Sequence, residues 1–133
     1  MITINNQQVF ITIGGTRLVQ KIHHITGKQF QSDDEAFTWV LESGWFKRYK
    51  DELIQLLHQS AMAEIYRSAP LHKQINAALG IYDARQTQDI KEVIVSVRDK
   101  TAQQEAIINE ATTLTELTKI AYDLSHSSMR LTK

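Results

Sequence analysis

The sequence carries two adjacent histidines, His23 and His24, whose imidazole nitrogens are potential metal ligands. Adjacent side chains diverge by about 100° on a helix and face opposite sides of a strand, whereas a metal-binding pair on a helix is usually spaced i, i+4. The other histidines, which are isolated in the sequence, are His58, His72 and His126. The spacing therefore predicts no metal site from sequence neighbours, and only a cluster assembled by the fold would provide one.

Asp33, Asp34 and Glu35 form an acidic cluster of a type that suits acid–base catalysis or Mg²⁺ binding. The cluster follows Ser32 and completes a capping box, in which the serine hydroxyl accepts a hydrogen bond from the helix start and the glutamate reaches back. Acidic residues in a first helical turn are also favoured by the helix dipole. We therefore interpret the cluster as a helix start at Asp33 and not as a catalytic or metal site.

Motifs for nucleophilic or phosphate chemistry are missing from the sequence. Gly14-Gly15 lacks the further glycines and the Lys-Ser/Thr pair of a phosphate-binding loop. The serines have no nucleophile-elbow context, and there is no cysteine to act as a nucleophile or as a ligand of zinc or an iron–sulfur cluster. We predict that the protein is not an enzyme and uses no metal or cofactor.

The composition limits the remaining classes of function. The 133 residues, 42% of them hydrophobic, are enough for one core. The 15 Lys and Arg balance the 15 Asp and Glu, so no net field attracts nucleic acid or an anionic membrane. The sequence shows neither a signal peptide nor an apolar run near the roughly 20 residues of a membrane span. We expect a soluble protein made in a cytoplasm.

The segment from Trp45 to Lys50 combines aromatic rings with three cations. It suits a nucleic-acid surface, because aromatic faces stack on bases and cations neutralise phosphates. We favour a helix that buries Phe46 and Tyr49 and leaves the cations solvated, because the basic cluster is short and acidic residues follow it at once. Further leucines continue this face, namely Leu53, Leu56 and Leu57.

The N-terminal segment predicts a β-hairpin with one buried face. Its apolar residues alternate on either side of residues 5–8, with the period of a strand: Ile2, Ile4, Val9, Ile11 and Ile13. Phe10 then points outward. An isolated hairpin is marginally stable in water, so we expect it to pack on helices or on another chain. Residues 16–27 have apolar residues at helical spacing and predict a helix, with a strand as the alternative because of their β-branched content.

Helix starts and stops are expected at several later positions. The first helix is expected to start at Asp33 and to be stopped by Gly44, with Phe37, Val40 and Leu41 buried and Trp39 toward its flank. Further helices are predicted at about residues 46–66, 71–79 and 88–110, the last of them capped by Thr87 and forming one arm of a helical hairpin or short coiled coil. A second capping box, Thr113 to Glu116, opens a final helix that ends near Leu124, before a loose polar tail.

Pro70 precedes a short helix that carries Lys73, Gln74 and Asn76. These three side chains suit a docking patch that contacts a neighbouring subunit through charge-assisted and amide hydrogen bonds. Alternatively, Gln74 and Asn76 tie down the turn around Pro70 by satisfying backbone groups that the proline leaves open. The sequence leaves both interpretations open.

One resemblance lies in the C-terminal half. Three motifs follow one another in this half. The first reads Tyr, a short gap, Pro-Leu-x-Lys-Gln-Ile-Asn-Ala-Ala, Gly, Ile-Tyr; the second reads Ile-x-x-x-Ile-x-x-Val-Arg; and the third reads Glu-x-x-Ile-x-x-Ala-Thr-Thr-Leu-x-Glu-Leu. Together they resemble a helical segment of tailed-bacteriophage and prophage tail proteins. That segment closes tail-fibre, baseplate-associated or tail-assembly polypeptides and often reads Tyr-Pro-x-x-Lys-Gln-x-Asn. Here three residues separate Tyr66 from Pro70. The matching positions are Tyr66, Pro70, Lys73, Gln74, Asn76, Ile90, Ile94, Val97, Arg98, Glu105, Ile108, Ala111, Thr112, Leu114, Glu116 and Leu117.

The resemblance implies a protein of the virion tail, made in the host bacterial cytoplasm, that acts through surfaces and not through catalysis. Its implied partners are other phage tail or baseplate proteins, and it would be homo-oligomeric or present in many copies. The alternatives are a non-virion chaperone of tail or tail-fibre assembly, and a small nucleic-acid-binding regulator that uses Trp45 to Lys50. A role in binding nucleic acid or a membrane is not expected from the charge balance.

The sequence thus predicts a mainly α protein (α+β) with a small N-terminal β-hairpin and a helical hairpin or bundle in its C-terminal half. Residues 1–30 would form the N-terminal region, and residues 31–133 a helical domain with a turn at Pro70. The candidate interface residues are Phe10, Trp45, Lys73, Gln74 and Asn76.

Overall fold

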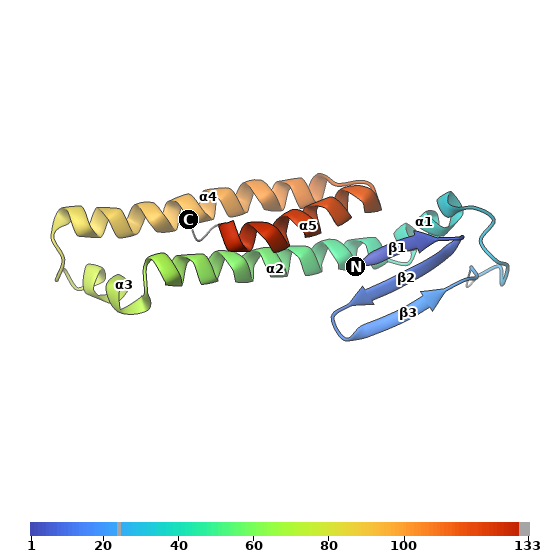
Figure 1. Ribbon diagram of the computed structural model, residues 1–133, viewed down its shortest axis with the longest axis horizontal. Helices are drawn as coiled ribbons and strands as arrows, with labels where there is room; N and C mark the ends of the chain where they lie inside the picture. Colours follow the sequence, from blue (N-terminus) through green and yellow to red (C-terminus); the bar gives the residue numbers. More distant parts are fainter. Residues whose placement is uncertain (24, 131–133) are drawn as a thin grey trace. The chain divides into compact units, whose positions relative to one another are not determined.

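The computed structural model describes residues 1–23 and 25–130, the last four of these by their backbone alone. The predicted fold class is confirmed, because a small antiparallel sheet precedes a series of helices (Figure 1). The elements are β1 (Ile2–Asn5), β2 (Gln8–Ile13), β3 (Thr16–Gln20), α1 (Asp33–Glu42), α2 (Trp45–Ser68), α3 (Leu71–Ala78), α4 (Ala84–Glu110) and α5 (Leu114–Arg130). No helix in the described ranges is long and apolar enough to cross a membrane.

The chain forms two compact units. Unit 1 comprises Met1–Leu53 and Ala111–Ala121, and unit 2 comprises Ile54–Glu110 and the described part of Tyr122–Lys133. Helices α2 and α5 each contribute residues to both units. The domain boundary between residues 30 and 31 that the sequence suggested stays a prediction.

The predicted hairpin in unit 1 is confirmed as β1 and β2, which pair antiparallel with Ile4 opposite Val9. Asn6 and Gln7 connect the strands, and both have positive φ angles, of 50° and 62°. Two such residues are typical of a type I′ turn, whose twist matches that of the flanking strands. The Gln7 N–H donates to the Asp33 carboxylate at 3.0 Å, so the turn is held by the start of α1.

Residues 16–20 form a third strand, so the predicted helix over residues 16–27 is wrong and the strand alternative is correct here. Gly14, with a φ of 57°, makes the tight turn that returns the chain alongside β2. The sheet order is β1-β2-β3, with Phe10 opposite Val19 and Ile11 opposite Leu18. Pairing with β2 satisfies the backbone hydrogen-bonding groups of residues 16–20. The stabilisation from this pairing outweighs the helical preference that the spacing of the apolar residues indicates.

Helix α1 begins and ends where the sequence predicted. Its cap is the expected capping box, because the Glu35 N–H donates to the Ser32 hydroxyl at 3.1 Å and the Gln31 N–H donates to the Glu35 carboxylate at 3.1 Å. Two details were wrong, since Trp39 is buried and Leu41 is exposed. The buried face is centred on Trp39, whose ring centroid lies 6.0 Å from that of Phe30. Phe30 lies before the helix, so the helical spacing of apolar residues does not predict this contact.

The core of unit 1 lies between the inner face of the sheet and the helices that cover it. Its buried apolar residues are Ile2, Val9, Ile11, Ile13, Phe30, Ala36, Trp39, Val40, Phe46, Tyr49, Leu53, Ala111 and Leu117. The alternation predicted for the two strands thus directs the expected isoleucines and Val9 inward, whereas Ile4 is only half-buried. Unit 1 therefore contains most of the buried apolar side chains among the described residues.

Unit 2 contains the C-terminal part of α2, followed by α3 and α4. After Pro70 the chain enters α3, and Gly80 ends that helix with a φ of 74°. Helix α4 begins at Ala84, four residues before the predicted start, so the predicted Thr87 cap is wrong. Asp83 caps the helix instead, because the Gln86 N–H donates to its carboxylate at 2.8 Å and its own N–H donates to the Gln86 side chain at 3.2 Å.

Helix α5 opens at the predicted capping box. The Glu116 N–H donates to the Thr113 hydroxyl at 3.2 Å, and this hydroxyl in turn donates to the Glu116 carboxylate at 3.1 Å. The helix continues to Arg130 and does not end near Leu124, so residues 125–130 of the predicted loose tail are helical. Residues 131–133 of that tail lie outside the described residues.

Candidate interaction surfaces

The histidines do not gather into a metal site in the described part of the chain, where no three His, Cys, Asp or Glu side chains form a suitable group. His23 pairs with Glu42 at 3.6 Å in unit 1, and His58 pairs with Glu105 at 3.2 Å in unit 2. The His126 ring stacks on Tyr122 with 3.9 Å between centroids. His24, the second member of the predicted pair, lies outside the described residues.

The acidic cluster of α1 is occupied by structural hydrogen bonds. Asp33 accepts from the β1–β2 turn and Glu35 from the backbone before the helix. The Ser32 hydroxyl is the N-cap acceptor. These contacts account for Asp33 and Glu35 through helix initiation and through the closure of unit 1, as the interpretation of the capping box predicted, and Asp34 lies between them in the first helical turn.

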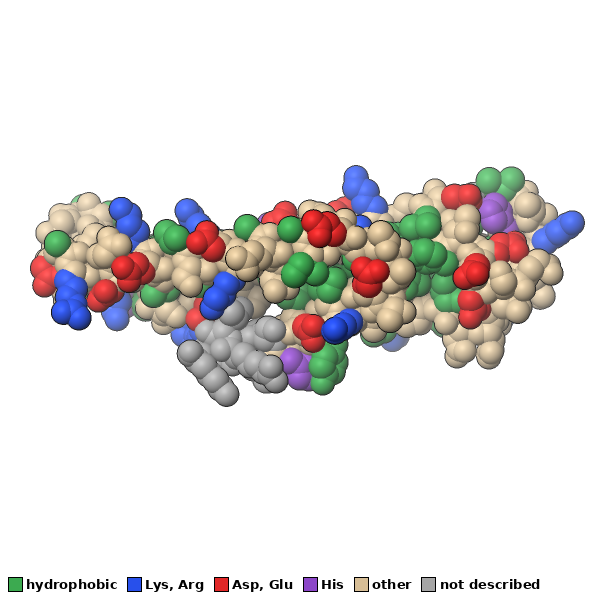
Figure 2. Space-filling view, turned by 90° about the horizontal axis from the view of Figure 1, so that it is seen from above, with side chains coloured by type: hydrophobic (Ala, Val, Ile, Leu, Met, Phe, Trp, Pro, Cys, Tyr) green, Lys and Arg blue, Asp and Glu red, His purple; other side chains and the backbone are tan. Residues whose placement is uncertain are grey.

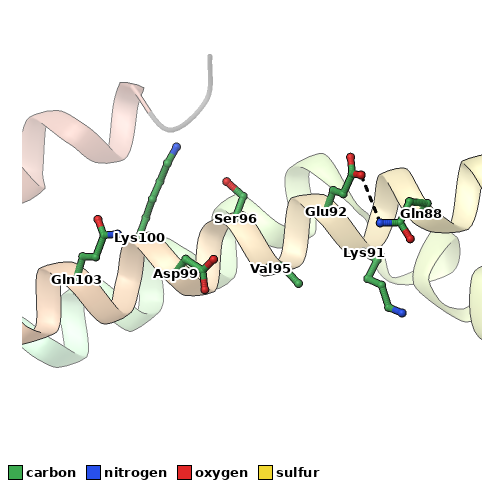
Figure 3. A pocket seen from close by; sticks show the side chains of 8 residues that line it. All are labelled: Gln88, Lys91, Glu92, Val95, Ser96, Asp99, Lys100 and Gln103. Carbon is green, nitrogen blue, oxygen red and sulfur yellow. Dashed lines mark hydrogen bonds between the residues drawn. The ribbon is translucent and has the colours of Figure 1, made fainter.

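One depression in unit 2 is a shallow face of a single helix. All eight lining side chains belong to α4 and fan out in different directions (Figure 3). Gln88 donates to Glu92 at 3.3 Å across one end of it. A ligand site encloses most of its ligand between several elements, so this face is suited to contact a surface and not to hold a small molecule.

A smaller cavity of about 150 Å³ lies among α2, α4 and α5 within unit 2. Leu57, Val97 and Leu124 provide its apolar wall, and the Thr101 hydroxyl donates to the Val97 carbonyl at 2.7 Å. Sites for drug-sized ligands usually have about 300 to 1,000 Å³. The cavity is therefore a packing gap in the helical unit, and the nearby hydroxyl already has a partner.

The aromatic segment at the start of α2 packs largely as the favoured interpretation predicted. Phe46, Tyr49, Leu53 and Leu57 are buried, at spacings that follow one helical stripe. Leu56 is exposed although it lies seven residues after the buried Tyr49, so its predicted burial is wrong.

Two of the three cations of this segment, Arg48 and Lys50, lie over its own rings. Arg48 lies 4.3 Å from the centroid of the Trp45 ring, and the Lys50 ammonium lies 5.0 Å from that of Phe46. A ring covered by a neighbouring cation offers less of its face to a stacking base. Trp45 is half-buried in this arrangement. The segment therefore contributes mainly to the unit 1 core.

Tyr49 has a buried hydroxyl that makes no hydrogen bond of normal geometry in the described part of unit 1. Burial raises the pKa of this phenol above its usual 10, the nearby Thr118 side chain lowers it in part, and the charge of Glu52 raises it. A neutral phenol is therefore the stable form in the folded protein.

The α3 candidates fall into two groups. The Gln74 amide donates to the Ala69 carbonyl at 2.7 Å, immediately before Pro70, and the Asn76 amide donates to the Tyr82 hydroxyl at 3.4 Å. The Gln74 contact is of the kind expected if this amide ties down the turn around Pro70, whereas the Asn76 contact lies beyond the other end of α3. Lys73 is exposed at the edge of a depression that also contains Tyr82 and Asp89. Of the three, Lys73 is the side chain available to a partner.

The most exposed apolar residues in and directly after α3 are not among the interface residues predicted from the sequence. Leu71, Ile75 and Leu79 recur at i, i+4 and i+8 and are 59%, 48% and 69% exposed, and Ile81 follows with 64%. We call these four residues the α3 stripe. The spacing alone places Leu71, Ile75 and Leu79 on one helical face, and the tertiary structure shows that the described residues leave this face exposed.

Unit 2 as a whole exposes more large apolar side chains than it buries. Its buried apolar residues, among those described, are Leu57, Ala69, Val97 and Ile108. Its exposed large ones are Leu56, Met62, Tyr66, Leu71, Ile75, Leu79, Ile81, Val95, Ile107 and Tyr122. Single exposed apolar residues are normal on a protein surface, but a contiguous group marks an interaction site.

The outer face of the sheet is a second partly apolar surface. Phe10 is 38% exposed, as its predicted outward direction implied, and its cross-strand neighbour Val19 is 49% exposed. Charges elsewhere are mixed, since Lys and Arg side chains alternate with Asp and Glu over the face drawn in Figure 2.

No family model matches this chain, and neither a curated protein nor a solved structure matches it.

Proposed function

We propose that this protein is a structural component of a bacteriophage tail and that it acts through protein–protein contacts made by the α3 stripe. The observation that carries the proposal is the exposure of Leu71, Ile75 and Leu79 on one face of a short amphipathic helix. Such a face is typical of a helix that docks on a partner, where residues at i, i+4 and i+8 act as anchors.

The stripe is large enough to contribute substantially to binding. Complete burial of one Leu or Ile side chain provides about 1.5–3 kcal/mol relative to full exposure. The four residues of the stripe are each about half to two-thirds exposed, so a partner that covers them gains a corresponding part of this free energy from each. A compact apolar cluster with a polar surround is the usual centre of a protein interface.

The surroundings of α3 hold the stripe in a fixed position. Gln74 fixes the helix to the backbone before Pro70, and Asn76 contacts Tyr82 beyond the end of the helix. A pre-ordered surface loses less conformational entropy on binding than a flexible one. Lys73 lies at the rim, where a charge adds specificity more than affinity.

The phage assignment within this proposal comes from the sequence resemblance. The matching residues Pro70, Lys73, Gln74 and Asn76 lie in and beside α3, in the same segment as the exposed stripe. A tail protein that is present in many copies needs docking surfaces more than a reactive centre. The proposed partners are accordingly other tail or baseplate proteins, and the proposed location is the virion tail.

Mass spectrometry of purified phage particles tests the location, with the copy number counted against the major tail-tube protein. We expect stoichiometric presence. Abundance in infected cells together with absence from particles would contradict a virion component and would favour an assembly chaperone.

A pair of variants tests the docking surface in the same particles. Ile75→Asp places a charge in the centre of the stripe, whereas Val95→Asp places the same charge at a similarly exposed position on α4. Both variants should remain helical by circular dichroism. We expect only Ile75→Asp to be lost from particles, and equal incorporation of the two would exclude the α3 stripe as the docking surface.

A further inference from the structure

We propose that one exposed face of α4 pairs with the same face of a second copy of this chain, antiparallel and about a two-fold axis at Val95. We call this face the α4 outer face, and it comprises Lys91, Glu92, Val95, Arg98 and Asp99. All five side chains are exposed, whereas the buried Val97 and Ile108 mark the opposite, packed side of the helix. The inference concerns α4 and does not depend on the proposed role of the α3 stripe.

The charged residues of this face surround an apolar side chain. Positions three and four residues away from Val95 lie on its own side of the helix, and these positions carry the four charges. Lys91, Val95 and Asp99 follow one another by one turn along α4 (Figure 3). Val95 itself is 49% exposed, so the centre of the face is open to a partner.

The charges of the α4 outer face are not compensated within the chain. Among the described residues, no ion pair involves Lys91, Arg98 or Asp99. Glu92 accepts a hydrogen bond from Gln88 at 3.3 Å, and this amide leaves the carboxylate charge in place. Two cations and two anions give the face no net charge, so it favours neither a purely acidic nor a purely basic partner.

The order of the charges along the helix makes the face complementary to itself. In an antiparallel pair centred on Val95, each residue lies opposite the one that is equally far on the other side of the centre. Lys91 then faces Asp99 of the second copy, and Glu92 faces Arg98 of the second copy. The two-fold axis repeats both ion pairs. A parallel pair would instead bring each charge beside its own counterpart, and like charges repel one another.

The residues farther along α4 also fit this arrangement. Gln88 and Ala102 are exposed and lie seven residues from Val95 on either side, so a small side chain faces each glutamine. Arg85 and Glu105, at ten residues on either side, are again opposite in sign. The apolar contact at the centre is small and exposed ion pairs contribute little free energy each, so we expect a weak, reversible dimer whose geometry is specified by charge.

The test measures self-association of the full chain by sedimentation equilibrium over a range of concentrations. An acidic variant, Lys91→Glu/Arg98→Glu, and a basic variant, Glu92→Lys/Asp99→Lys, each bring like charges together in the pair. Each should lower the affinity of self-association by about tenfold or more. Mixed in equal amounts, the two variants place opposite charges at every one of these positions, and we expect the mixture to form a heterodimer.

The matched control is Lys47→Glu/Lys119→Glu, which makes the same change in net charge at exposed positions outside α4. It should self-associate as the wild-type chain does. All variants should remain helical by circular dichroism. Recovery in the mixture separates the loss of a specific contact from a general loss of structure.

Disulfide cross-linking tests the direction and the centre of the pair, because the chain contains no cysteine. Val95→Cys should cross-link two copies on mild oxidation. Gln88→Cys alone should not, since its two thiols would lie about 21 Å apart along the axes of an antiparallel pair. A mixture of Gln88→Cys with Ala102→Cys should cross-link.

Three results would overturn the proposal. A wild-type chain that stays monomeric at every concentration would exclude the pair, and so would a mixture of the acidic and basic variants that fails to associate. Efficient cross-linking of Gln88→Cys by itself would show a parallel arrangement. Val95→Asp places two like charges at the axis and should weaken the dimer, yet it should still enter particles through the α3 stripe, so this proposal and the proposed function can fail separately.

Discussion

The two units of this protein differ in how far their own side chains can stabilise them. In the described residues, unit 1 buries thirteen apolar side chains, whereas unit 2 buries Leu57, Ala69, Val97 and Ile108 and exposes ten large ones. A strand pattern with period 2 places half of its residues on a single inner face, and helices then cover that face. Unit 1 therefore has the buried core of a conventional domain. The stability of unit 2 depends more on its helix caps and on any partner that covers its exposed apolar residues.

The first prediction compares the same substitution in both units. Leu53→Ala removes a buried side chain of unit 1 and should cost about 2–5 kcal/mol of unfolding free energy. Leu79→Ala removes an exposed side chain of unit 2 and should cost less than about 0.5 kcal/mol. Urea unfolding followed by circular dichroism measures both values. Similar large costs would break the comparison, because they would show that the α3 stripe is covered in the free protein.

The second prediction concerns local opening in the free protein. Amides in β2, between buried Val9 and Ile13, should exchange hydrogen about a hundredfold more slowly than amides in α3, which contains no buried side chain. The reason is that opening α3 exposes little additional apolar surface. Native-state hydrogen exchange by nuclear magnetic resonance measures the ratio. Equal protection of the two elements would mean that the units open together.

The third prediction compares two helix caps. Ser32→Ala removes the N-cap acceptor of α1 and Asp83→Ala removes that of α4, and each should cost about 0.5–2 kcal/mol. Asn at either position keeps an acceptor and should restore most of the loss. Because unit 2 has the smaller core, the α4 variant should also lose helical content before global unfolding in a thermal scan. If both variants lost their helical content only at the midpoint of global unfolding, the expected difference between the two units would be contradicted.

The fourth prediction concerns alkaline pH and unit 1. Since burial raises the pKa of Tyr49, the unfolded phenol ionises first, at about pH 10, and the folded one at higher pH. The stabilising contribution is complete below pH 10 and is lost as the pH rises through the folded pKa. Tyr49→Phe should change stability by less than about 1 kcal/mol at pH 7, because the hydroxyl makes no hydrogen bond of normal geometry.

The matching measurement is the urea midpoint of both proteins at pH 8 and pH 11. We expect a larger alkaline loss in the wild-type chain than in Tyr49→Phe. Other titrating groups are shared by the two proteins and cancel in the difference. An identical loss in both proteins would mean that the Tyr49 environment opens to water before global unfolding.

Several helix boundaries could be predicted from the sequence, because capping residues and glycines next to the helix ends determine them. Ser32 with Glu35 and Thr113 with Glu116 form the caps that their spacing indicated, and Gly44 and Gly80 end helices with positive φ. The Asp83 to Gln86 pair carries the same kind of signal for α4, and a stricter search for such pairs would have found it. These features involve neighbours within one turn, so the sequence contains all of the information.

Features that depend on tertiary contacts were harder to predict. Residues 16–20 became a strand because β2 offered a partner, and Trp39 became buried because Phe30 packs against it. The exposure of Leu71 and Ile75 also depends on what lies outside α3 and not on their own pattern. The sequence pointed to α3 and to Phe10 as surfaces, but it could not show which of their side chains the fold leaves exposed.

The path of the chain also has a consequence for synthesis. Unit 1 is discontinuous, because residues 54–110 are inserted between its two segments and Ala111 and Leu117 complete its core. A ribosome adds about 5–20 residues per second, so the first segment waits roughly 3 to 11 seconds for the second. During this interval the inner face of the sheet lacks part of its cover. A chain that terminates at residue 110 would leave the ribosome with that core unfinished.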